Sequence, residues 1–244
     1  MFHAGLLTTR QAPVPDWPTW LQAHAQSARD PRLRAFCATG TVAGTTPLRE
    51  VPLMALDIET TGLDPVHDGI VSLGLVPLTL DRVQASAARH WLLRPRVPLP
   101  DRAVTLHGIT HQQIVQAPDL DDVLGEVLAA MAGHVMVVHC REIERGFMDS
   151  ALQRRLGETL AFPVIDTMAL EARWQRRPLP LWRRWLGHAP RPVSLRLAAC
   201  RERYGLPRYR LHHALTDALA TAELLQAQVA HHVSPDTPVR TLWL

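Results

Sequence analysis

Short apolar runs of strand length alternate along the chain with stretches whose apolar residues recur at helical spacing. Residues 51–58 (VPLMALDI) form the clearest strand pattern, an apolar run with a carboxylate near its end. Residues 69–80 and 84–93 are interpreted as a hairpin, and residues 134–139 (HVMVVH) and 161–165 as two further strands. The pattern therefore predicts five strands.

Helical spacing is clearest over residues 120–131, which follow a proline-punctuated loop and are closed by Gly133 as a stop signal. The other helices predicted in this part of the chain span residues 142–156, 167–174, 194–204 and 212–233. Strands that alternate with helices in this way predict an α/β fold of three layers, with a mixed five-stranded sheet flanked by helices.

The same pattern divides the chain into a main domain and two flanking segments. Residues 1–48 are predicted to be a helical N-terminal extension, with one or two short helices over residues 17–36. The main domain is predicted over residues 49–233, followed by a tail over residues 234–244. Within the domain, residues 174–192 are dense in Arg, Trp and Pro and predict an inserted loop or lid.

The composition is that of an ordinary globular protein. Hydrophobic residues make up 47% and charged residues 20% of the 244 positions, which excludes a disordered chain or a coiled coil. The three widely spaced cysteines argue against a disulfide framework or a structural zinc site. Because no apolar run approaches the length that spans a bilayer, no membrane association is expected, and a reduced, cytoplasmic protein is the default.

The chain contains no Lys and no Asn, so every basic side chain other than His is an arginine. The 26 arginines against 23 acidic residues leave a formal charge of only +3. We attribute this bias first to a GC-rich genome, because the codons for Lys and Asn are rich in A and T.

Acidic residues stand at the ends of the predicted elements. Asp57 and Glu59 lie two apart at the end of the first strand and therefore project to the same side. Like charges held that close repel unless a cation lies between them or one group stays protonated. A solvated strand end is the structural alternative.

Two further constellations follow along the chain. The helix after the strand at 134–139 contains Glu142, Glu144 and Asp149, and acidic residues in the first turn of a helix are also favoured by the helix dipole alone. His212 and Asp217 introduce the last helix, where a histidine is equally compatible with a capping or surface role.

Taken in order, these segments resemble the DEDDh family of 3′–5′ exonucleases, which includes the proofreading epsilon subunit of bacterial DNA polymerase III. The resemblance covers roughly residues 50–230 and rests on the segments ALDIETTGLDP (55–65), LHGIT (106–110), VVHCREIERGFM (137–148), VIDT (164–167) and HHALTDALATAELL (212–225).

The resemblance implies a ribonuclease H-like fold and hydrolysis of the terminal phosphodiester with two divalent cations, Mg²⁺ or Mn²⁺. It implies that Asp57, Glu59, Glu144 and Asp217 are the metal ligands and that His212 is the general base. Carboxylate oxygens suit such cations, and a near-neutral imidazole suits proton transfer from water. Thr60, Thr61, Leu63 and His107 are the expected substrate contacts.

The second motif departs from the family pattern. Cys140 stands where the family usually has Asn, and Ile143-Glu144 replaces an aromatic residue followed by Asp. Glutamate keeps the charge but is one methylene longer, so we expect activity to survive. Glu142 and Asp149 are the weaker candidates for this ligand, and Asp166 is interpreted as a fold-supporting residue.

The substrate is expected to be the 3′ end of a nucleic acid. Eleven arginines lie between Arg173 and Arg210, interleaved with Trp and Tyr, and are expected to flank the acidic site. Single-stranded or frayed DNA is the first choice, and RNA 3′-end trimming or a non-catalytic, polymerase-accessory binding module are the alternatives. A separate polymerase subunit and a homodimer are further possible partners.

Overall fold

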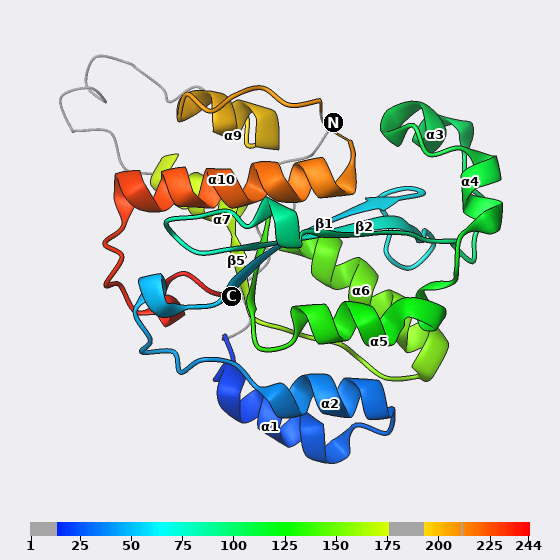
Figure 1. Ribbon diagram of the computed structural model, residues 1–244, viewed down its shortest axis with the longest axis horizontal. Coiled ribbons are helices and arrows are strands. Elements are labelled where there is room, and N and C mark those ends of the chain that lie inside the picture. The colour runs from blue at the N-terminus through cyan, green and yellow to red at the C-terminus, as the bar shows by residue number, and fades with distance from the viewer. Residues whose placement is uncertain (1–13, 176–192, 211) are drawn as a thin grey trace, which may run out of the picture.

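The computed structural model describes residues 14–175, 193–210 and 212–244. Its centre is a mixed five-stranded sheet in the order β3-β2-β1-β4-β5, in which β1 runs antiparallel to β2 and parallel to β4 (Figure 1). The predicted α/β fold with a mixed five-stranded sheet is confirmed. The strands are β1 (Leu53–Thr60), β2 (Ile70–Leu78), β3 (Arg89–Leu92), β4 (Val135–Val138) and β5 (Val164–Asp166).

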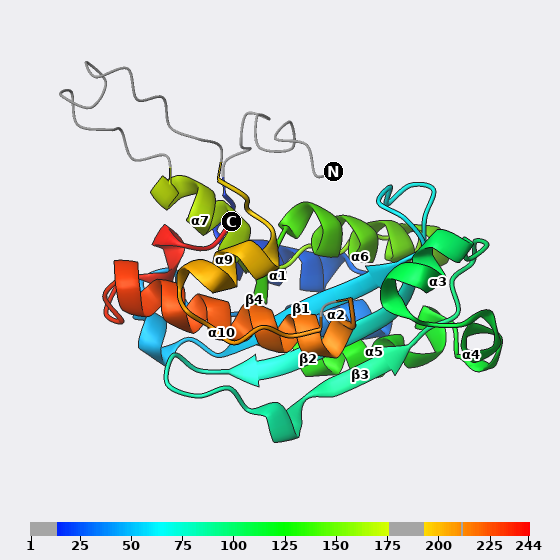
Figure 2. The same ribbon diagram turned by 90° about the horizontal axis from the view of Figure 1, so that it is seen from above.

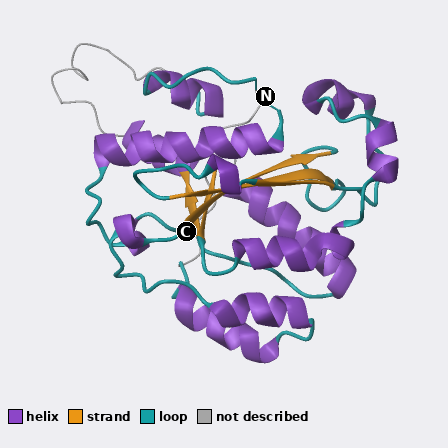
Figure 3. Ribbon diagram, viewed as in Figure 1, coloured by secondary structure: helices purple, strands orange, loops and turns teal. Residues whose placement is uncertain are grey.

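Helices cover both faces of the sheet (Figure 3), with α10 lying across β1 and β2 (Figure 2). The α-helices are α1 (Trp17–Ser27), α2 (Pro31–Thr39), α3 (Asp101–His107), α4 (His111–Gln116), α5 (Leu120–Met131), α6 (Arg141–Leu156), α7 (Thr167–Gln175), α9 (Leu197–Arg203) and α10 (Ala214–His232). Short 3-10 turns add η2 (Leu48–Glu50), η3 (Ala85–Ala87) and η4 (Val239–Thr241).

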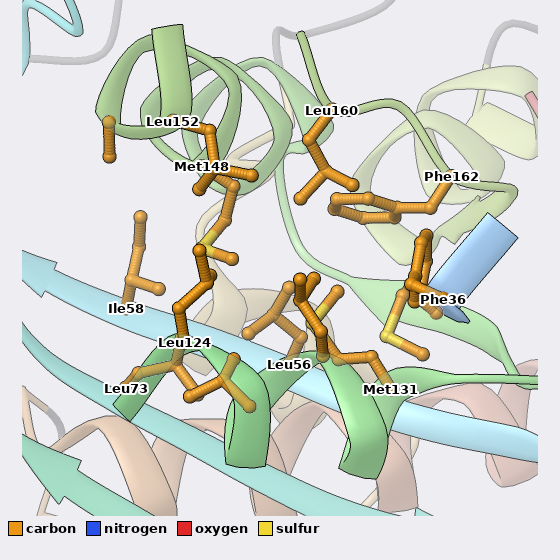
Figure 4. Packing of buried hydrophobic residues seen from close by; sticks show 14 of the residues in the cluster. Phe36, Leu56, Ile58, Leu73, Leu124, Met131, Met148, Leu152, Leu160 and Phe162 are labelled. Atoms are coloured by element: carbon orange, nitrogen blue, oxygen red, sulfur yellow. The ribbon is translucent and has the colours of Figure 1, made fainter. Parts of the chain in front are cut away.

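The apolar alternation of β1 divides the core between the two faces. Leu56 and Ile58 pack with Leu124 of α5 and Met148 of α6 (Figure 4). On the opposite face, Leu53 and Ala55 pack beneath α10. Because side chains alternate along a strand, Asp57 and Glu59 share the α10 face of β1.

The N-terminal helices form an additional layer beneath α5 (Figure 1). Asp16 and Asp30 cap α1 and α2, each of which has a proline in its first turn. Leu21, Leu33 and Phe36 are buried in the same apolar cluster as α5 and α6. The helices expected at residues 17–36 therefore contribute to the core of the main domain.

The tail beyond α10 returns to the open edge of the sheet. Trp243 is 4% exposed and forms an isolated antiparallel bridge with Ile165, and the Leu244 amide donates to the Val164 carbonyl at 2.8 Å. These contacts cover the backbone edge of β5, which an edge strand otherwise leaves unpaired.

Two segments differ from the sequence prediction. The expected proline-punctuated loop contains α3 and α4, which are too short for apolar periodicity to reveal them; Gly108, with φ +74°, ends α3 in a left-handed cap. The second hairpin strand is shortened to Arg89–Leu92 because the 3-10 turn η3 interrupts it. The predicted insert at residues 174–192 lies outside the described residues beyond Gln175.

Gly74 of β2 sets how closely α10 approaches the sheet. A Cβ atom at this position would lie 2.6 Å from the backbone of Ala214 and Leu215 in the first turn of α10. In the sheet, Gly74 is the partner of Asp57 on β1. The missing side chain therefore lets α10 begin directly against the row that carries the acidic residues.

We expect Gly74→Ala to lower the free energy of unfolding by about 1–3 kcal/mol, because the added methyl group must push α10 away from the sheet. Gly125→Ala is the matched control, because Gly125 is exposed inside α5 and its nearest neighbour to a new Cβ is Arg32 at 3.7 Å. The control should gain about 0.5–1 kcal/mol in urea denaturation, since alanine favours a helix interior. Equal effects of the two substitutions would contradict the close-packing account.

Candidate active site

Four carboxylates from three elements meet at one end of the sheet. Asp57 and Glu59 lie near the C-terminal end of strand β1. Glu144 lies in the first turn of α6, and Asp217 lies in the first turn of α10. Asp57 lies within electrostatic range of the other three carboxylates. The structure thus brings together all four residues that the sequence predicted as metal ligands.

Burial and mutual repulsion oppose ionisation of this group. Burial raises the pKa of Glu59 to about 8, and the nearby charge of Asp217 adds to this effect. The pKa of Asp57 is raised by its burial and by its three acidic neighbours. Burial also raises the pKa values of Glu144 and Asp217. A group of carboxylates in this state is stabilised by any bound cation.

The donor set fits a divalent cation. Glu144 Oε2 and Asp217 Oδ1 are buried oxygen atoms that have no hydrogen-bond partner among the described residues. One ligand atom each of Glu59, His212 and Asp217 lies within 4.8 Å of the others. Hard cations such as Mg²⁺ and Mn²⁺ prefer oxygen ligands of this kind.

His212 is exposed at the rim of the acidic group. Its backbone N–H donates to Asp217 Oδ2 at 2.8 Å, which ties the residue to the first turn of α10. Its φ of +69° is unusual for a side chain other than glycine. In the described chain, the other non-glycine residue with a positive φ is Cys140, immediately before α6, with φ 151°. Both strained positions flank the carboxylates.

The structure distinguishes Glu144 from its two neighbours in sequence. Glu144 is 4% exposed and lies near Asp57. Glu142 instead pairs with Arg141 at 3.2 Å, and Asp149 accepts a bond from the Leu160 amide at 2.8 Å. Glu144 is therefore the acidic residue of α6 that is placed to complete the site.

Asp166 supports the backbone around the site, in agreement with its interpretation as a fold-supporting residue. It is 1% exposed and accepts hydrogen bonds from the amides of Met168 and Ala169 at the start of α7. A third bond comes from the Arg141 amide at 3.1 Å. One carboxylate thus holds the first turns of both α6 and α7.

The predicted substrate contacts after β1 occupy two different environments. The Thr60 hydroxyl donates to the Gly62 carbonyl, and the buried Thr61 hydroxyl donates to Asp68 and accepts from the Gly69 amide. These hydroxyls hold the loop in shape. Leu63, by contrast, is 63% exposed and is free to contact a ligand.

His107 is buried and faces the site with an unpartnered nitrogen. Its Nδ1 accepts from the Ile109 amide at 3.0 Å, so the neutral ring carries its hydrogen on Nε2. That Nε2 has no partner among the described residues, and burial together with the nearby His212 lowers the pKa of the ring. The geometry leaves His107 with one buried donor available to a ligand.

Several arginines that the sequence suggested as phosphate contacts bind acidic groups of the protein itself. Arg201 is 2% exposed and pairs with Glu223, while Arg203 pairs with Glu171 and Arg208 with Glu202. Arg196 and Arg210 are exposed. The arginines of residues 176–192 lie outside the described part of the chain.

Gly74 is a site-forming residue that the motifs did not reveal, because it acts through contact with a helix 140 positions later. A glycine inside an otherwise apolar strand was nevertheless a usable signal, since such a residue often marks a close backbone approach.

The RNase T family model, described as "Exonuclease", matches residues 54–225, which contain all five predicted catalytic residues. The chain belongs to this exonuclease family. The prediction of a DEDDh, DnaQ-like 3′–5′ exonuclease is thereby confirmed.

Curated relatives of this exonuclease include much longer proteins. DNA polymerase III PolC-type of Clostridium perfringens is 30% identical over 173 residues, which are 71% of this chain and 11% of that protein. A DNA polymerase III subunit epsilon-like protein of Rhodobacter capsulatus is 29% identical over 73% of this chain and 24% of its own length. The chain therefore spans a minor part of these relatives.

A solved structure supports the fold assignment. The nuclease domain of 3′hExo, a DEDDh family member bound to rAMP, superposes with a TM-score of 0.60 at 18% identity, over 74% of this chain and 92% of that one. The expected ribonuclease H-like architecture is confirmed. No helix that the structure describes has the length and apolar character needed to cross a membrane.

The raised carboxylate pKa values predict a stability that falls with pH in the absence of cations. Because the folded state holds protons that the unfolded state has released, the free energy of unfolding should decrease up to about pH 8, the pKa of Glu59. From about pH 7.5 upward this effect is largely isolated, because His90, His107 and His139, whose lowered pKa values act in the opposite direction, are then mostly neutral in both the folded and the unfolded state.

Thermal unfolding in EDTA and in Mn²⁺ at pH 7.5 and pH 8.5 measures this dependence. We expect Mn²⁺ to raise the melting temperature more at pH 8.5, and Asp57→Asn combined with Glu59→Gln to remove both the pH slope and the Mn²⁺ effect. A wild-type melting temperature that rises between these pH values in EDTA would rule out a shared, proton-holding carboxylate site.

Proposed function

We propose that the chain is a metal-dependent 3′–5′ exonuclease that hydrolyses terminal phosphodiester bonds of single-stranded or frayed DNA and releases nucleoside 5′-monophosphates. The observation that carries this proposal is the convergence of Asp57, Glu59, Glu144 and Asp217, with His212 at their rim. Two divalent cations held by these carboxylates would supply Lewis acidity to the attacking water and the leaving 3′ oxygen.

His212 is proposed to accept the proton of the attacking water. The side chain is exposed at the mouth of the site, and its backbone is fixed by the bond from its N–H to Asp217. A base in this place is close to the acidic group without being buried within it. Imidazole suits this role because it can exchange a proton near neutral pH.

The terminal nucleotide is proposed to lie between the loop after β1 and the end of α3. Leu63 offers an exposed apolar side chain for a base, and His107 offers a buried Nε2 hydrogen for a substrate oxygen. The hydroxyls of Thr60 and Thr61 already bond within the loop, so their proposed contribution to substrate binding is through the backbone.

DNA is favoured as the substrate because the relatives above are named as DNA polymerase III proteins. By the same reasoning a separate polymerase subunit is a proposed partner, and a homodimer remains a prediction. RNA trimming is the second candidate, since the 3′hExo domain was solved with rAMP. A binding module without activity is the alternative from another class.

The decisive experiment offers 3′-labelled and 5′-labelled DNA and RNA oligonucleotides to the protein in Mn²⁺. We expect wild type to shorten single-stranded DNA from its 3′ end, and Asp57→Ala and Glu144→Ala to lower kcat by about 10²–10³-fold. Faster shortening of RNA would instead select the RNA-trimming candidate.

Glu142→Ala is the matched control, because Glu142 lies in the same turn of α6 but pairs with Arg141. It should retain most of the activity. A fully active Glu144→Ala variant would refute the assignment of the α6 ligand. Intact 3′ ends in wild type, combined with a gel shift of the oligonucleotide, would establish the binding module instead.

His212→Ala separates a base from a metal ligand. If His212 is the base, kcat should fall by roughly 10²–10⁴-fold while the Mn²⁺ affinity, measured by calorimetry, stays unchanged. Because a base must be unprotonated to act, the rise of kcat with pH on the acidic side should also disappear. A large loss of Mn²⁺ affinity would show that His212 binds the cation, as its distance from Glu59 and Asp217 permits.

A further inference from the structure

Two histidine rings from distant elements stack beside the active site. The ring of His213, the residue immediately before α10, lies against that of His90 on β3, with centroids 4.9 Å apart and planes at 26°. Their contact joins the edge strand of the sheet to the helix that carries Asp217.

The His90 ring is fixed from the sheet side. Its Nε2 is hydrogen-bonded to Ser72 Oγ at 2.9 Å, and Ser72 is 1% exposed. In the antiparallel register, Ser72 is the partner of Glu59, and His90 is the partner of Gly74. The stacked ring is therefore anchored in the same row of side chains as the acidic residues of β1.

The backbone of His213 is hydrogen-bonded to the first turn of α10. Its carbonyl accepts the Asp217 amide at 2.9 Å, and the next residue, Ala214, is the one whose backbone contacts Gly74. His213 provides no side-chain cap for the helix. Its imidazole is used instead for the stack on His90.

His212, the residue before His213, has a strained backbone that must be held by its neighbours. His212 holds φ at +69°, which the backbone of a residue with a side chain adopts reluctantly. On one side its amide is tied to Asp217. Among the described residues, the C-terminal side of His212 is held by His213, whose ring stacks on that of His90.

We propose that His90 and His213 are positioning residues, which hold His212 and Asp217 in register with the carboxylates of β1, and that Ser72 orients the His90 ring. This inference rests on the proposed function, because it assigns the two histidines a role in that reaction. A neighbouring side chain that fixes a reacting group in this way raises kcat without contacting the substrate.

The test compares His90→Ala, His213→Ala and the double variant in degradation of labelled single-stranded DNA. Each single variant should lose about tenfold in kcat with KM unchanged, and the double variant should lose no more than either single one, because both break the same contact. His90→Phe keeps a flat ring and should recover most of the loss. Losses that multiply in the double variant would overturn the proposal.

A second readout does not depend on activity. Hydrogen exchange of the His212 amide, measured by NMR in EDTA, should be slow in wild type and in His90→Phe and faster in His90→Ala, because the bond to Asp217 loosens. His24→Ala is the matched control, since His24 also stacks on an aromatic ring, that of Trp20 on α1. It should change neither the exchange of His212 nor kcat.

The possible failures are distinguishable. A rise in KM at constant kcat would show that the exposed rings bind a nucleobase and would overturn the positioning role. Unchanged exchange of the His212 amide in His90→Ala would overturn it as well. If wild type degrades no oligonucleotide, the proposed function fails, whereas faster exchange of His212 in His90→Ala would still support the mechanical link between β3 and α10.

Discussion

The repulsion among four carboxylates, of which Glu59, Glu144 and Asp217 are buried and Asp57 is partly exposed, is the constraint around which the rest of the structure is arranged. Glu144 and Asp217 stand in the first turns of α6 and α10, where the helix dipole partly offsets a negative charge. That help is insufficient, because the pKa values of the group remain raised, that of Glu59 to about 8. The fold therefore holds the four carboxylates in an arrangement that a bound cation would stabilise. The close packing of α10 against Gly74 limits how far Asp217 can move away from the carboxylates of β1.

Much of this arrangement could be predicted from the sequence because it follows from local patterns. The alternation in β1 predicts that Asp57 and Glu59 share one face, and the periodicity of residues 120–131 predicts the bounds of α5. The short helices α3 and α4 escaped, since one or two turns carry too little periodicity. The contacts of His90 with Ser72 and His213 escaped for another reason: they join residues far apart in the chain, and no local pattern encodes them.

The arginine-rich composition has a structural consequence as well as an electrostatic one. In a chain without lysine, arginine also fills roles inside the fold: Arg145 stacks over Trp17 and binds the Phe162 carbonyl, and Arg155 pairs with Asp119 at 2.7 Å. Such pairs suit the planar, multidentate guanidinium group. The number of arginines in the sequence therefore overstates how many are available to bind phosphate. Arg201, for example, pairs with Glu223, and Arg203 pairs with Glu171.

Cys140, which stands where the family usually has asparagine, has an unusual backbone conformation. The position has φ 151° and ψ 80°, outside the regions that residues with a side chain usually adopt, and a 6% exposed cysteine takes this conformation. The strain persists because its neighbours are held on both sides. The His139 ring lies 2.8 Å from the Thr167 hydroxyl and 2.9 Å from the Leu195 carbonyl, and the Arg141 amide is bound by Asp166. The hydrogen bonds of His139 and Arg141 thus hold the backbone conformation from which Glu144 reaches the site.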